Sequence, residues 1–137
     1  MLRFFLLLTL ISSLLFAKDN YEQKLYENIL PKVFHKNSVH IFITDDETKK
    51  VLNNSTILKI VQECNDADIV IGNSFNQESA NCKKKPSFAL DYRAYKHSQS
   101  AIGAFYWRKG RPQIAFSKKS FKKYKLTIPQ SLQKYVQ

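Results

Sequence analysis

The sequence predicts a small single-domain α/β fold, with a partly parallel sheet, flanking helices and a C-terminal β-hairpin followed by short helices. Short apolar runs of strand length alternate with helical patterns, which is typical of parallel strands joined by helices. The stretch from Ser100 to Ser117 has the pattern of two strands around a basic turn. Once residues 1–17 are set aside, 120 of the 137 residues remain, which is enough for one domain with its own core.

The first 17 residues have the layout of a secretory signal peptide. Arg3 precedes an apolar run that is too short to span a bilayer comfortably, and Ala17 suits the last position before cleavage. Leu15 is larger than the small residue preferred three positions before the cut, so an uncleaved anchor is the alternative. We expect residues 1–17 to be removed on export to the periplasm, leaving residues 18–137 as the mature domain.

The mature chain is strongly basic. With Arg3 removed it keeps 21 basic and 11 acidic side chains, a net charge near +10. In a cytoplasmic protein this balance would indicate nucleic acid, but export argues against that partner. Anionic lipid head groups, a cell-wall polymer or an acidic protein face are the partners that such a charge favours, while a merely soluble surface explains it equally well.

The first half of the domain contains a helix, a strand and a second helix. Apolar residues in "KDNYEQKLYENILPKVF" recur at helical spacing and predict a helix to about Leu30, with a kink or break at Pro31. Val39 to Ile43 alternate as in a strand, and Asp45 or Asp46 can cap the helix that follows.

The secondary structure of the middle of the chain is harder to predict from the sequence pattern. Residues in "STILKIVQEC" fit a strand through Ile60 or a helix, and periodicity leaves both open. "NDADIVIGN" predicts a short strand to Ile71 that ends at Gly72. A polar loop or short helix, "NSFNQESANCKKK", then leads to a further strand in "PSFALDY".

The predicted hairpin is "AIGAFYW", a turn "RKGR", and "PQIAFS". Its first strand places Ile102, Ala104 and Tyr106 on one face and Gly103, Phe105 and Trp107 on the other. Gly110 suits the left-handed position of a bulged loop of three to four residues, and Pro112 favours an edge strand. We expect Phe105 and Trp107 to be buried under a helix, and Gly103 to mark either a close backbone approach or simple tolerance of a glycine.

Two short helical elements close the chain. Phe121 and Tyr124 lie on one side of a basic helical turn. A last helix begins near Pro129 and turns Leu132, Tyr135 and Val136 inward.

Cys64 and Cys82 are the only cysteines. In an oxidising compartment such a pair predicts one disulfide. Because each cysteine precedes a strand of a parallel sheet, both lie at the same end, which makes the bond geometrically reasonable. The three histidines, His35, His40 and His97, lack the spacing of a metal site, so no metal is predicted.

No nucleophile elbow, phosphate loop, zinc-protease motif or full dinucleotide fingerprint occurs, so the sequence predicts a non-enzymatic binding protein without a cofactor. The residues expected to bind a partner protein are Tyr106, Arg108, Lys109 and Arg111, because aromatic and arginine side chains dominate interface energetics. The alternative is a small anionic solute held beyond the carboxyl ends of the strands. The residues expected there are Thr44, Asp45, Asn73, Ser74, Asp91, Tyr92 and Arg93.

Four segments, "ECNDADIVIG", "KPSFALDY", "AIGAFYWRKGRPQIAFS" and "YKLTIPQSLQKYV", resemble the YfiR-like family of periplasmic regulators over roughly residues 25–136. Cys64 matches that family's cysteine before a short apolar strand. The family's partner cysteine commonly lies upstream, whereas here the only other thiol is Cys82. The resemblance implies a compact periplasmic α/β domain that restrains a membrane-bound sensor, a diguanylate cyclase or histidine kinase, and whose stability depends on its disulfide state. The sequence does not predict an oligomeric state.

Overall fold

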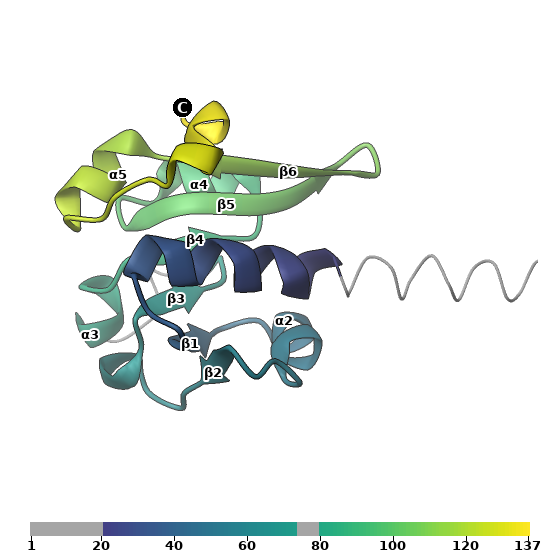
Figure 1. Cartoon of the computed structure of the whole chain (residues 1–137), viewed down its shortest axis with the longest axis vertical. Helices are drawn as coiled ribbons and strands as arrows, with labels where there is room; N and C mark the ends of the chain where they lie inside the picture. The colour runs from purple at the N-terminus through teal and green to yellow at the C-terminus, as the bar shows by residue number, and fades with distance from the viewer. Residues whose placement is uncertain (1–20, 74–79) are drawn as a thin grey trace, which may run out of the picture.

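A six-stranded sheet forms the centre of the molecule (Figure 1). The structure is a computed structural model and describes residues 21–73 and 80–137. The predicted signal peptide and Ser74 lie outside those residues. The strands are β1 (Val39–Ile43), β2 (Leu58–Ile60), β3 (Ile69–Ile71), β4 (Ser87–Ala89), β5 (Ala101–Arg108) and β6 (Arg111–Phe116). Their order across the sheet is β2-β1-β3-β4-β5-β6.

The first five strands run parallel, and β6 returns antiparallel to β5. The predicted α/β class and partly parallel sheet are therefore confirmed. The short helices between and after the strands are α2 (Asp46–Leu52), η1 (Cys64–Asp66), α3 (Ala80–Lys83), α4 (Tyr92–His97), α5 (Lys118–Lys123) and η3 (Gln130–Tyr135). The ambiguous stretch between Ser55 and Cys64 forms the edge strand β2 and then a turn of 3-10 helix.

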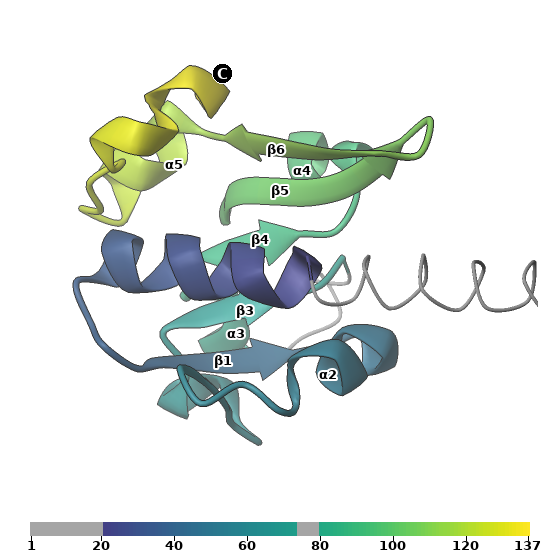
Figure 2. The ribbon, with the colours of Figure 1, turned by 45° about the vertical axis from the view of Figure 1, so that its right-hand side comes forward.

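The N-terminal helix (residues 21–34) lies across one face of the sheet, while α3 and α4 lie behind it (Figure 2). Its apolar side is fully buried through Tyr26, Ile29, Leu30 and Val33. These side chains join the main core on this face, together with Leu52 of α2, Phe121 of α5 and Leu132 of η3. Burying an apolar side chain of this size stabilises the fold by about 2 kcal/mol.

The break predicted at Pro31 is wrong. The helix continues to residue 34, and the Lys36 amide bonds to the Pro31 carbonyl at 3.1 Å. Proline removes one helical hydrogen bond. The turn that follows is nevertheless held, because Val33 is fully buried and Phe34 packs against the core.

The opposite face of the sheet carries two smaller clusters. Cys64 and Cys82 pack with Val70 and the half-buried Phe42 beneath η1 and α3. Next to them, Tyr95 of α4 covers a patch of small alanines on β4, β5 and β6. The predicted disulfide is present, with the two Cα atoms 5.1 Å apart, inside the usual range for disulfides.

A register shift in β5 changes which residues share a face. Ser87 pairs with Ala101 but Phe88 pairs with Gly103, so Ile102 is an extra residue on the β5 side. Such a bulge reverses the alternation of side chains locally. Ile102 therefore packs in the main core with Phe105, and its predicted place on the face of Ala104 and Tyr106 is wrong.

Gly103 marks a close approach, the first of the two alternatives. A Cβ there would lie 2.5 Å from the Ala115 carbonyl oxygen and 2.8 Å from Cε2 of Phe88. The hairpin turn itself is shorter than predicted. Only Lys109 (φ 52°) and Gly110 (φ 75°) separate the paired residues Arg108 and Arg111, which makes a two-residue loop with both central residues left-handed.

Candidate functional site

The five parallel strands β1 to β5 all end on the same side of the sheet, and the turn between β5 and β6 lies on that side too. In Figure 1 this is the right-hand side, where α2, the start of the N-terminal helix and the β5–β6 turn all lie. In α/β proteins ligands bind preferentially beyond this edge. The predicted partner-binding residues lie here, and so do the predicted solute-binding residues that the structure describes, Ser74 being outside them.

Most of the residues predicted for a small solute hold the fold together. The Asp45 carboxylate caps α2 by accepting from the Thr48 amide at 3.0 Å and the Thr48 hydroxyl at 2.6 Å. Asp91 caps α4 by accepting from the Ala94 amide at 2.7 Å. One carboxylate oxygen of each residue is therefore engaged in structural hydrogen bonds.

The side chains of Asn73 and Thr44 also make contacts within the fold. The Asn73 side-chain oxygen accepts from the Leu90 amide at 2.7 Å, linking the ends of β3 and β4. The Thr44 hydroxyl lies 3.4 Å from the Ile71 carbonyl and packs against Gly72 (φ 152°), where no Cβ would fit. Tyr92 and Arg93 are exposed. Anion binding at this edge stays a prediction.

The residues predicted to bind a partner surround the hairpin turn. Arg108, Lys109 and Arg111 are exposed. Tyr106 is half-buried, with its ring 5.6 Å from the ring of Tyr92 on α4. Three cations and two tyrosines therefore lie within one small region of surface.

Trp107 is exposed, contrary to the burial expected for it. The exposed fraction of Trp107 is 39%, whereas that of Phe105, two residues earlier on the same face, is 2%. The difference follows the position along β5, because Trp107 pairs with Pro112 next to the turn, where the strand becomes exposed. Its proximity to the turn is the sequence signal that indicates exposure.

Two further aromatic side chains are exposed beside it. Tyr21 is 43% exposed with its ring 6.2 Å from that of Trp107, and Tyr92 is 41% exposed. Sequence reasoning did not single out Tyr21. We call this surface the aromatic–basic end; its members are Tyr21, Tyr92, Arg93, Tyr106, Trp107, Arg108, Lys109 and Arg111.

Two clefts flank Trp107. One, of about 470 Å³, lies between α4 and the hairpin and is lined by Tyr92, Arg93, Tyr106 and Arg108 among others. The other, of about 540 Å³, lies between the N-terminal helix, α2 and β5. We call it the acidic cleft, and its lining is Glu22, Asp45, Glu47, Thr48, Lys50, Val51, Leu90, Phe105 and Trp107.

Tyr26 of the N-terminal helix packs its ring edge-on against Phe88 and Phe105 in the main core. The side chain is fully buried, and its hydroxyl has no hydrogen-bond partner in the described part of the chain. Burial, reinforced by the negative charges of Glu22 and Asp45, holds the pKa of Tyr26 well above its ordinary value.

A cationic cleft of about 580 Å³ lies at the other end of the sheet, away from the hairpin turn. Its lining includes Lys96, Lys119 and Lys123, with Ser98, Ser117 and Gln137 among the neutral residues. The Lys123 ammonium donates to the Gln99 carbonyl at 3.5 Å. Positive charge therefore gathers at both ends of the sheet, around the hairpin turn and around α5.

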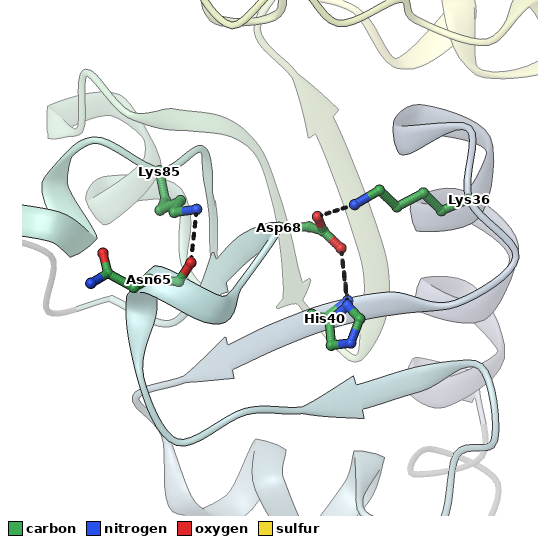
Figure 3. A network of polar contacts seen from close by, with 5 residues as sticks. All are labelled: Lys36, His40, Asn65, Asp68 and Lys85. Carbon is green, nitrogen blue, oxygen red and sulfur yellow. Dashed lines mark hydrogen bonds and ion pairs between the residues drawn. The ribbon is translucent and has the colours of Figure 1, made fainter.

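A polar network near the start of β1 and β3 centres on Asp68 (Figure 3). Its carboxylate accepts from the Lys36 ammonium at 2.6 Å and from the His40 backbone amide at 2.9 Å, while the Lys85 ammonium donates to the nearby Asn65 carbonyl. Burial alone would raise the pKa of Asp68, but the bonds and charges of Lys36 and His40 outweigh it and hold the pKa below its ordinary value. This network clamps the loop before β3 to β1.

Among residues 21–73 and 80–137, no group of three or more histidine, cysteine, aspartate or glutamate side chains is arranged to hold a metal ion. Within those ranges no helix is long and apolar enough to cross a membrane. The disulfide indicates an oxidising, extracytoplasmic compartment.

Comparison with known proteins defines the fold class and nothing finer. No family model and no curated protein matches the chain. A crystal structure of a conserved domain protein from Vibrio cholerae O1 biovar El Tor strain N16961 is similar, with a TM-score of 0.57 and 12% identity. The match covers 86% of this chain and 58% of that one, so this chain spans little more than half the length of its structural neighbour.

Proposed function

We propose that this chain is a periplasmic, non-enzymatic regulatory protein that binds the periplasmic part of a membrane-bound sensor through its aromatic–basic end. The signal-like residues 1–17 and the disulfide support export. The class of partner, a diguanylate cyclase or histidine kinase, is suggested by the sequence resemblance to YfiR-like regulators.

The observation that carries the proposal is the composition of the aromatic–basic end. Within the described ranges, the large apolar side chains that are exposed are Tyr21, Tyr92 and Trp107, and all of them lie there, next to the arginines of the hairpin. Tryptophan, tyrosine and arginine are the residue types that contribute most at protein interfaces. The cations project from a two-residue turn between paired strand residues, so a partner does not have to order a long loop before it can contact them.

Capture of the partner from detergent-solubilised envelopes tests the proposal. The variant Arg108→Glu/Arg111→Glu reverses two charges on exposed side chains, and the double variant Lys32→Glu/Lys59→Glu makes the same charge change on exposed positions elsewhere. We expect at least a tenfold loss of one captured membrane protein with the first variant and none with the second. Equal capture by both folded variants would contradict the proposal.

Anion binding is the second candidate, at a different place from the strand ends expected from the sequence. The three lysines of the cationic cleft favour it. A ligand that binds only the folded state raises the melting temperature by mass action. Inorganic phosphate and citrate should then stabilise the wild-type chain more than the variant Lys119→Gln/Lys123→Gln. The absence of any such shift would exclude this candidate.

A further inference from the structure

Charge is divided unevenly across the sheet. Residues 21–73, which form the N-terminal helix and the strands β1, β2 and β3, contain 6 basic and 8 acidic side chains. Residues 80–137, which form β4, β5 and β6, contain 14 basic side chains and a single acidic one, Asp91. Since the strand order is β2-β1-β3-β4-β5-β6, the boundary between the two halves falls between β3 and β4. The half that contains β5, β6 and α5, at the top of Figure 1, is therefore almost purely cationic.

Carboxylates do not neutralise the cations of this half. Within the described ranges, the ion pairs are those of Asp68 with Lys36 and His40, which belong to the other half of the sheet. The Lys96 ammonium lies over tyrosine rings, and the Lys123 ammonium donates to a backbone carbonyl. These neutral partners leave the positive charge uncompensated. A field of one sign over a surface attracts ligands of the opposite charge.

Two clefts lie at the two ends of α4, and cations line both. The cleft of about 470 Å³ between the start of α4 and the hairpin is lined by Arg93 and Arg108 and by the one acidic side chain of this half. We call it the hairpin cleft. The cationic cleft, between the end of α4 and α5, is lined by Lys96, Lys119 and Lys123. Because α4 has 6 residues, its length between the clefts is only about 9 Å.

Both clefts open on the same face of the sheet. Tyr95 lines the cationic cleft and Tyr106 lines the hairpin cleft, and both side chains pack in the alanine cluster beneath α4. This face is the one opposite the N-terminal helix (Figure 2). Between the clefts, α4 exposes Arg93 and Lys96. An extended anion therefore reaches both clefts along α4 without passing around an edge of the sheet.

We propose that the α4 face binds a linear polymer with repeated phosphate groups, which follows α4 and enters both clefts. Arginine and lysine are the side chains that bind phosphate, the first through its planar fork and the second as a point charge. A small anion would occupy one cleft and leave the cations of the other unneutralised. A flat bilayer surface would not enter recesses, whereas a polymer chain does. This site goes beyond the proposed partner binding and does not depend on it.

Isothermal titration calorimetry of the purified chain with inorganic polyphosphate and with pyrophosphate tests the proposal. Pyrophosphate, which has only two phosphate groups, is too short to occupy both clefts across the length of α4. Simultaneous contact with two sites raises the affinity of a chain that spans them. We expect polyphosphate to bind at least tenfold more tightly than pyrophosphate when the two are compared per phosphate group. Equal affinity per phosphate group would overturn the proposal.

Charge removal assigns the binding to the two clefts. The variants are Arg93→Gln/Arg108→Gln in the hairpin cleft and Lys119→Gln/Lys123→Gln in the cationic cleft. The matched control, Lys32→Gln/Lys59→Gln, removes two exposed cations from the other half of the sheet. Thermal unfolding checks that each variant folds, since all six side chains are exposed.

We expect each cleft variant to weaken polyphosphate binding at least fivefold and the control less than twofold. Binding should weaken steeply with salt, and the slope of log affinity against log salt should be smaller by about 1 in each cleft variant. An effect of only one cleft variant, or an equal effect of the control, would overturn the proposal. Displacement of bound polyphosphate by vesicles of phosphatidylethanolamine and phosphatidylglycerol would overturn it in favour of a membrane surface. Because no partner protein is present, these results are separate from the capture experiment.

Discussion

Removal of the disulfide is expected to lower the free energy of unfolding by about 3 kcal/mol at 25 °C, because the bond restricts the unfolded chain. Cys64 and Cys82 are separated by 18 positions, and the entropy lost by closing a loop of that length gives this value. The double variant Cys64→Ala/Cys82→Ala removes the bond.

Alanine is the suitable replacement because both cysteines are buried. Their exposed fractions are 4% and 7%, and they pack with Val70 and Phe42. Serine would place a hydroxyl among apolar groups and add a separate cost. Alanine keeps the site apolar. The change in the free energy of unfolding then comes mainly from the loss of the crosslink.

Urea unfolding of the wild type and the double variant measures the difference. In thermal unfolding, the melting temperature of the double variant should be lower than that of the wild type by on the order of 10 °C for a domain of this size. Reducing agent should destabilise the wild type by a similar amount and leave the variant unchanged. A loss below about 1 kcal/mol would refute the reasoning, since the disulfide would then contribute little beyond its packing.

Three further predictions concern stability. Gly103→Ala should cost about 1–3 kcal/mol in urea unfolding, because the added Cβ meets the rigid Ala115 carbonyl. Gly110→Ala should cost about 1 kcal/mol in the same assay, since its φ of 75° disfavours alanine although nothing blocks the side chain. Asp68→Asn should cost about 1 kcal/mol at pH 6 and much less at pH 2–3. The folded pKa of Asp68 is depressed, so its contribution is present above the unfolded pKa and lost as pH falls through the folded one.

Each of these predictions has an outcome that would contradict it. If Gly103→Ala left the free energy of unfolding unchanged, the backbone of β5 and β6 would have to shift easily to make room for the added Cβ. Gly110→Asn is the control for the turn, because asparagine tolerates left-handed backbone, and it should cost less than Gly110→Ala. If Asp68→Asn were equally destabilising at both pH values, the Lys36 ion pair would not be the source of the effect.

The sequence was sufficient to predict the strands other than β2, the hairpin and the disulfide. Alternation in residues 39–43 and the apolar run at 69–71 are signals that depend only on local pattern. The disulfide was predicted from a single pair of cysteines in a chain expected to be exported. The bond was geometrically reasonable because each cysteine precedes a strand of the parallel sheet.

Features that depend on tertiary contacts could not be predicted. The helix passes Pro31 because Val33 is buried by the sheet, and the bulge at Ile102 results from pairing with β4. Neither the continued helix nor the bulge can be recognised from the local sequence pattern.

The same limit applies to the candidate site. The cations of the turn were predictable from their neighbours in sequence. The acidic cleft brings together Glu22, Asp45 and Trp107 from distant parts of the chain, and only the folded arrangement relates them.

Site-specific crosslinking in intact cells tests the central claim, that this chain acts by surface contact through its aromatic–basic end. A photoreactive amino acid is placed at Lys109 in the turn or at Lys32 on the N-terminal helix, both of which are exposed. We predict that position 109 crosslinks to one envelope membrane protein and that position 32 does not. The absence of a crosslink from position 109, or the same products from both positions, would contradict the claim.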